Sequence, residues 1–129
     1  MTTTYTIKLR CAVESEPNRH RGSHWPQTKR KQAQKEHVTL LLESWLSAMR
    51  SHHHQFAPGI PKRVHLVRFH VLGVGLDSDN LPCAFKKIRD SVAEWFHVDD
   101  GPKGPITWKY SQCKVAQGER WTGKMLLIF

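Results

Sequence analysis

The chain has 129 residues, which is enough for one domain with a single hydrophobic core. Its hydrophobic fraction of 39% argues against global disorder, and no stretch approaches the roughly 20 apolar residues that span a membrane. Three cysteines without metal-type spacing, and an N-terminus without the apolar core of a signal peptide, predict a reduced, cytoplasmic protein.

Charge is distributed unevenly along the chain. The net charge is +9, and a basic surface attracts phosphate polymers. All five aspartates nevertheless lie in 77–100, a window with six of the 11 acidic residues but only three of the 20 lysines and arginines. Metal-dependent phosphodiester chemistry requires such an acidic island in a basic protein, because the surroundings hold a polyanion while the island holds a cation.

Hydrophobic periodicity predicts a single mixed α/β domain over 1–129, of the α+β kind, with the element order β-α-β-α-β-β. The expected elements are a strand over 5–13, a helix from about Pro26, a strand over 64–74, a helix over 80–96, and strands over about 106–115 and 120–129. The last two strands are joined by a short turn that contains glycine, so we expect them to form a hairpin.

The segment LDSDN lies where the second strand gives way to the second helix. Residues i and i+2 of an extended chain face the same way, so Asp77 and Asp79 point to one side. Two carboxylates this close repel each other unless a cation or a proton lies between them, and Mg²⁺ prefers oxygen ligands. Both aspartates are therefore candidate metal ligands. The alternative is that Asp79 or Asn80 only caps the helix.

The second helix carries further candidates. Lys86 and Asp90 project from the same helical face as Asp79, opposite the apolar stripe. A lysine and an aspartate four residues apart also form an ordinary helical ion pair; we interpret Asp90 in this way, while for Lys86 both interpretations stay open. Asp99 and Asp100 precede a glycine, as in many turns, but beside LDSDN they supply a candidate third carboxylate ligand.

The run LDSDNLPCAFKKIRDSVAEWFHVDD, followed by ITWKYSQCKV, resembles the RusA family of Holliday-junction resolvases and their phage and prophage relatives. The shared pattern is a DxDN segment, a helix with a K-x-x-x-D step, and a DD pair before a hairpin. The resemblance implies a small, intertwined α/β homodimer that cuts branched DNA with Mg²⁺, for which Mn²⁺ is a possible substitute. It also implies that Asp77, Asp79 and Asp100 hold the metal and act in catalysis together with Lys86.

The sequence departs from the family pattern at the lysine. In the best-known members this lysine lies about one turn after DxDN, where this chain has Pro82 and Cys83, whereas Lys86 lies two turns on. Whether Lys86 takes over the role stays open. A continuous helix over 80–96 would also be about 25 Å long and would separate Asp79 from Asp100. Either the helix is shorter or bent, or Asp100 comes from a second protomer; our hypothesis is a composite site across a dimer.

A basic stretch without any acidic residue runs from Pro17 to Lys35. Its candidate DNA contacts are Arg19, Arg21, Trp25, Lys29, Arg30 and Lys31. The cations suit phosphate contact and Trp25 suits stacking on an exposed base, although a solvated basic helix with Trp25 in the core has the same composition. Two alternative functions stay open: a non-catalytic junction- or DNA-binding phage protein, and a metal nuclease for RNA or single-strand flaps.

Overall fold

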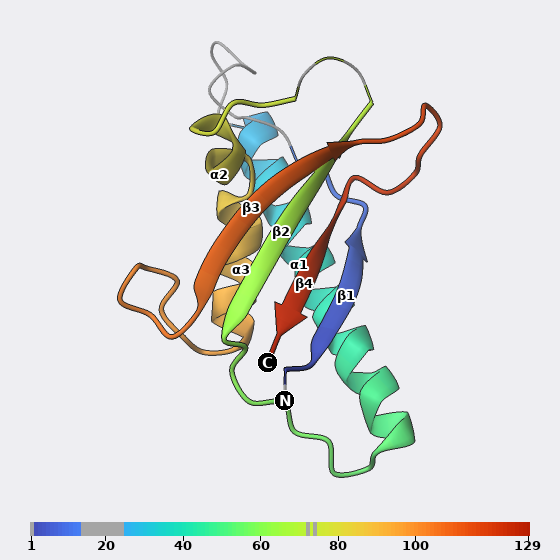
Figure 1. Ribbon diagram of the computed structural model, residues 1–129, viewed down its shortest axis with the longest axis vertical. Helices are drawn as coiled ribbons and strands as arrows, with labels where there is room; N and C mark the ends of the chain where they lie inside the picture. Colours follow the sequence, from blue (N-terminus) through green and yellow to red (C-terminus); the bar gives the residue numbers. More distant parts are fainter. Residues whose placement is uncertain (1, 14–24, 72, 74) are drawn as a thin grey trace.

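The computed structural model describes residues 2–13, 25–71, 73 and 75–129, with the backbone alone for 25–28. Within these residues a four-stranded sheet carries helices on one face (Figure 1). The elements in chain order are β1 (Thr4–Leu9), α1 (Trp25–His52), β2 (Arg63–His70), α2 (Asn80–Ala84), α3 (Lys86–Trp95), β3 (Thr107–Lys114) and β4 (Gly123–Ile128). The predicted mixed α/β class is confirmed. None of the described helices has the length and apolarity to cross a membrane.

The sheet is mixed, with the strand order β1-β4-β2-β3. β4 pairs antiparallel with both β1 and β2, while β2 and β3 pair in parallel. The parallel pair follows from the connection, because the helices α2 and α3 carry the chain back to the end of the sheet from which β2 started.

The predicted hairpin between the last two strands is wrong. β3 pairs with β2, and β4 pairs with β1 and β2, so that β2 lies between β3 and β4. The physical reason is burial. β4 carries Met125 and Leu127, which are fully buried, and therefore takes a central position. The first four residues of β3 alternate exposed polar side chains with partly buried aromatic ones, and no residue of the strand is fully buried, which suits an edge strand.

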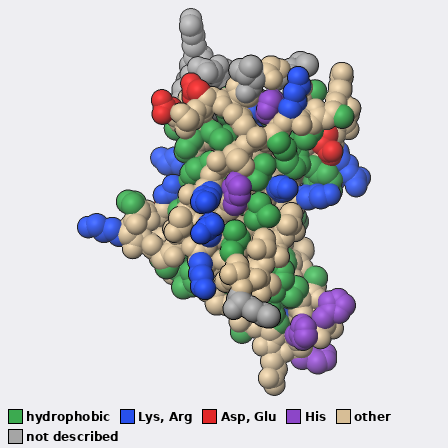
Figure 2. All heavy atoms as spheres, in the orientation of Figure 1, with side chains coloured by type: hydrophobic (Ala, Val, Ile, Leu, Met, Phe, Trp, Pro, Cys, Tyr) green, Lys and Arg blue, Asp and Glu red, His purple; other side chains and the backbone are tan. Residues whose placement is uncertain are grey.

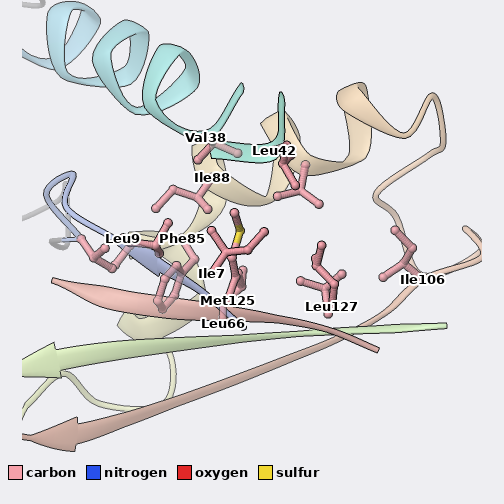
Figure 3. Close-up of a cluster of buried hydrophobic side chains, with 14 of the residues drawn as sticks. Ile7, Leu9, Val38, Leu42, Leu66, Phe85, Ile88, Ile106, Met125 and Leu127 are labelled. Carbon is pink, nitrogen blue, oxygen red and sulfur yellow. The ribbon is translucent and has the colours of Figure 1, made fainter. Parts of the chain in front are cut away.

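The hydrophobic core lies between the sheet and the helices (Figure 3). Alternate residues of β1, β2 and β4 point toward the helices and meet Val38 and Leu42 of α1. The strand residues are Ile7, Leu9, Val64, Leu66, Met125 and Leu127, and the contributions of the α2–α3 region are Leu81, Ala84, Phe85, Ile88 and Val92. The apolar faces of the helices, including the stripe predicted for the second one, thus face the core.

β2 ends at His70, earlier than the predicted end at Val74. Gly73 and Gly75 follow with φ of 76° and 85°, a left-handed conformation that cannot continue a strand. Gln112 of β3 then fixes the chain: its side-chain oxygen accepts a 3.0 Å hydrogen bond from the Leu76 N–H, and its amide donates to the Leu76 carbonyl. A side chain on Gly75 would collide with Gln112. This contact sets where the LDSDN segment begins.

The predicted continuous helix over 80–96 is broken into α2 and α3 at Phe85, which has φ −98° and ψ 0°. The Phe85 N–H bonds to the Pro82 carbonyl at 3.1 Å, a tighter turn than the α-helical one. The Phe85 ring is fully buried and lies 6.1 Å from the Tyr110 ring. Burial of this ring compensates for the interrupted helix and fixes the bend.

α3 ends in a sharp reversal at His97, whose φ is 58°. The His97 N–H bonds to the Glu94 carbonyl and the Val98 N–H bonds to the Ala93 carbonyl, which is the Schellman pattern of a helix end. The chain therefore turns back beside α3 and brings Asp99 and Asp100 toward the middle of that helix.

Candidate active site

An open pocket of about 260 Å³ lies where α2, α3 and the segment after α3 meet. It is lined by Pro82, Cys83, Lys86, Arg89, Asp90 and Asp100. Two of the sequence-predicted catalytic residues, Lys86 and Asp100, are therefore neighbours within one chain. The bend at Phe85 and the reversal at His97 together bring them to the same place.

Asp90 and Asp100 form a carboxyl pair in this pocket. Partial burial, a side-chain hydrogen bond with Asp100 and the Asp100 charge raise the pKa of Asp90 to about 6. The same hydrogen bond is the largest cause that lowers the pKa of Asp100, and the nearby Arg89 guanidinium lowers it further. The pair consequently shares one proton, which Asp90 carries below about pH 6.

Arg89 connects three parts of the structure at this pocket. Its Nη1 donates to the Tyr110 hydroxyl at 2.8 Å, and its guanidinium lies 5.3 Å from the centre of the Trp108 ring. Its Nη2 donates to the Asp100 carbonyl, and its Nε lies 3.5 Å from Asp100 Oδ2. The guanidinium thereby ties α3 to β3 and holds Asp100 against Asp90.

Lys86 lies at the start of α3 with an exposed side chain at the pocket. Burial and Asp100 raise the pKa of Asp90, and the Lys86 ammonium opposes them with a smaller lowering effect. Lys86 thus places a positive charge beside the carboxyl pair, where a bound phosphate would meet it.

The two members of the Asp99–Asp100 pair have different roles. The Asp99 side chain is exposed, and its Oδ1 accepts a 3.1 Å hydrogen bond from the Gly101 N–H, as in an ordinary turn. Asp100 instead lines the pocket. Of the two candidates for the third carboxylate, the geometry therefore favours Asp100.

Asp77 and Asp79 lie at the beginning of α2, outside the set of residues that line the pocket. Asp77 Oδ1 accepts a 2.9 Å hydrogen bond from the Asn80 N–H, so Asp77 caps the helix. Asp79 occupies the cap position with an exposed side chain that makes no capping hydrogen bond. The capping alternative thus applies to Asp77, while the carboxylate of Asp79 takes no part in holding the helix end.

A divalent cation fits the carboxyl pair better than it fits the predicted trio. Within the described part of the chain, no three His, Cys, Asp or Glu side chains lie close enough together to hold a metal ion. Asp90 and Asp100, however, lie within hydrogen-bonding reach of each other, and a hard cation can take the place of the proton between two carboxylates. Mg²⁺ is commonly held by one or two carboxylates while it keeps several waters.

The candidate DNA contacts lie at the start of the chain's long helix or outside the described residues. Arg19 and Arg21 fall outside them, and the side chain of Trp25 does as well. Lys29 and Lys31 of α1 are exposed, which suits contact with phosphate. Arg30 is partly buried, and its guanidinium nitrogens lack a hydrogen-bond partner among the residues described.

Sequence reasoning missed two residues of this pocket. Arg89 was not singled out, and Asp90 was interpreted as the partner of an ordinary ion pair. A signal for both existed in the helix, since Lys86, Arg89 and Asp90 are spaced i, i+3 and i+4 and share one face. Asp100, the residue that these side chains contact in the pocket, is brought close to them only by the reversal of the chain after α3.

The chain matches no model of a protein family and no curated protein. The pocket and the sequence pattern are therefore the features that bear on function.

The shared proton gives a first prediction. In a ¹³C NMR titration of the side-chain carboxyl carbons, Asp90 should titrate near pH 6. In Asp100→Asn its pKa should fall but stay above about 3.9, because partial burial, the largest cause of the shift, remains. Because the folded-state pKa of Asp90 is raised, its contribution to stability is present below about pH 4 and is lost as the pH rises through 6. Asp90→Asn should remove that part of the pH dependence.

The matched control is Asp99→Asn, which removes the adjacent charge but keeps an oxygen for the Gly101 N–H. It should leave the Asp90 titration near pH 6. If Asp90 titrates near 4 in the unmodified protein, the carboxyl pair does not share a proton.

Proposed function

We propose that this protein is a Mg²⁺-dependent endodeoxyribonuclease that cuts branched DNA, with four-way junctions as the substrate class. The observation that carries the proposal is the Asp90–Asp100 carboxyl pair, with Lys86 and Arg89, in one open pocket. The resemblance of LDSDN, the K-x-x-x-D step and the DD pair to RusA-like resolvases supports the same reaction. A net charge of +9 suits a polyanionic substrate.

Each residue of the pocket has a distinct task in this proposal. Asp90 and Asp100 hold the cation through carboxylate oxygens, and Asp90 gives up the shared proton to solvent when they do. Arg89 is a positioning residue that keeps Asp100 in place through its backbone carbonyl and its carboxylate. Lys86 stabilises the negative charge that develops on the phosphate. When bound, Mg²⁺ would supply an activated water and neutralise charge at the leaving oxygen.

Cleavage of a labelled four-way junction tests this proposal. The unmodified protein should nick the junction with Mg²⁺ and lose this activity with EDTA, and the rate should rise as the pH passes about 6, because Asp90 must be ionised. Asp90→Asn and Asp100→Asn should reduce cutting to background. Lys86→Gln should slow it by roughly 10²–10³-fold, as removal of a group that stabilises transition-state charge does.

Asp99→Asn is the control for the two aspartate variants and should cut at close to the normal rate, since Asp99 lies beside the pocket residue Asp100 but serves a turn. Duplex DNA, a single-strand flap and RNA, at the same salt, define the substrate class. Junction binding without cutting under any divalent metal would leave the non-catalytic alternative. Preferred cutting of RNA or flaps would replace the junction as substrate.

The roles of Asp77 and Asp79 follow from a second part of the proposal, a two-fold dimer. The pocket brings the carboxylates of Asp90 and Asp100 together within one chain. In our composite-site hypothesis, Asp77 and Asp79 of a second protomer supply the remaining ligands of the metal. A two-fold dimer then presents two such sites, as paired nicks across a junction require.

Subunit mixing tests the composite site. Asp79→Asn and Asp100→Asn should each be inactive alone. After subunit exchange, half of the dimers are mixed and each has one unmodified site, so nicking should recover to about a quarter of normal. No recovery, with exchange verified by mass spectrometry, would mean that both aspartates act within one chain. Normal cutting by Asp79→Asn alone would mean that Asp79 takes no part.

A further inference from the structure

The sheet has one face that no described helix covers. Core residues alternate along the strands and point toward α1 and α3, so the intervening residues point to the opposite side. These outward residues are Thr4, Thr6 and Lys8 of β1; Lys124, Leu126 and Ile128 of β4; Arg63, His65, Val67 and Phe69 of β2; and Thr107, Lys109, Ser111 and Cys113 of β3. Figure 1 shows this open face in front of the helices.

The open face is basic. Its outward positions include Lys8, Arg63, Lys109 and Lys124, and none of them is acidic. Three of these cations lie near His65 of β2, a central strand: after partial burial, Lys109, Lys124 and Arg63 each lower the pKa of that imidazole. Figure 2 shows lysine, arginine and histidine side chains in the middle of this face, with acidic side chains only toward its margins. We call Lys8, Arg63, His65, Lys109 and Lys124 together the basic sheet face.

An aromatic residue with its own group of cations extends this surface at one end. Lys8 Nζ lies 5.5 Å from the centre of the Trp121 ring, and the guanidinium carbons of Arg10 and Arg120 lie 4.9 and 5.2 Å from it. Trp121 is partly exposed just before β4. Lys8 belongs to both groups, so the positive charge continues from the sheet to the indole.

Among the possible occupants, a polyanion fits this face best. A second copy of the chain, docked by two-fold symmetry on the same face, would bring like charges against each other. An apolar protein partner would need a core depleted of charge, whereas lysine and arginine lie in the middle of this surface. A phosphate backbone instead gains from each of these cations through release of counterions.

We propose that the basic sheet face, with Trp121 at its end, binds the sugar-phosphate backbone of a DNA arm, separately from the phosphate that is cut. The pocket lies on the other side of β3, where Arg89 contacts Trp108 and Tyr110 at positions that alternate with Lys109. The choice of DNA over another polyanion rests on the proposed function. Lys29, Arg30 and Lys31, the predicted DNA contacts with described side chains, belong to α1 on the helical side of the sheet. The basic sheet face is therefore a second surface for the same substrate.

Fluorescence anisotropy with a labelled junction in metal-free buffer tests the proposal, because binding is then measured apart from cutting. Lys109→Gln/Lys124→Gln should bind on the order of tenfold more weakly at 0.1 M salt, and the slope of log K against log salt should fall by about two. Duplex DNA should show the same loss, since backbone contacts carry no sequence information. Thermal melts of both proteins verify folding.

The control is Lys103→Gln/Lys114→Gln, which removes the same charge from exposed lysines outside the basic sheet face. Lys114 lies on β3, five residues from Lys109, and therefore faces the other side. An equal loss in both variants would mean that net charge alone matters, and no loss in either would also overturn the proposal. Tighter binding of RNA than DNA, or a changed oligomeric state with unchanged DNA binding, would assign the face to another partner. A junction that binds through this face but is never cut would refute only the nuclease.

Discussion

Two carboxyl groups within hydrogen-bonding distance cannot both be ionised without a counter-charge, and the pocket is organised around this constraint. Below about pH 6, Asp90 and Asp100 meet this constraint with a proton on Asp90, and Arg89 and Lys86 supply positive charge beside the pair. A divalent cation between the carboxylates meets the same constraint and leaves the lysine free to interact with a phosphate. In the proposed nuclease, the pair with its proton is the metal-free form of the cation site.

The architecture serves this pair through contacts at some distance from it. Gln112 of β3 holds the Leu76 peptide and so fixes the beginning of α2. The buried Phe85 ring sets the bend between α2 and α3, and the reversal at His97 returns the chain to the middle of α3. β3 also makes a second contribution, because its Trp108 and Tyr110 contact the Arg89 guanidinium. The parallel pairing of β2 with β3 thus positions the pocket.

Local sequence patterns predicted what depends on neighbours along the chain. The strand alternation, the apolar helical faces and the mixed α/β class are all present. The hairpin failed because chain proximity favoured β3–β4 pairing, whereas burial of Met125 and Leu127 places β4 in the middle of the sheet. The helix break at Phe85 has no strong local signal, since its cause is a ring buried against the rest of the fold.

The site residues also divide into those whose role depends on sequence neighbours and those whose role depends on tertiary contacts. Asp90 looked like half of an ion pair because its partner Asp100 is ten positions away and arrives through tertiary structure. Asp77 looked like a metal ligand, and the structure adds a capping role that any aspartate before a helix can take. The open sheet face was likewise invisible in the sequence, because its cations are spread over β1, β2, β3 and β4 and meet only after the strands pair.

Paramagnetic Mn²⁺, which broadens NMR signals of nearby nuclei, tests the central claim that the Asp90–Asp100 pair is a metal site. Backbone amide signals of residues 83–90 and of Asp100 should lose intensity first on titration with Mn²⁺, excess Mg²⁺ should restore them, and Asp100→Asn should abolish the effect. Broadening centred on the exposed His52–His54 run, or unchanged in Asp100→Asn, would contradict the assignment of the metal to this pocket.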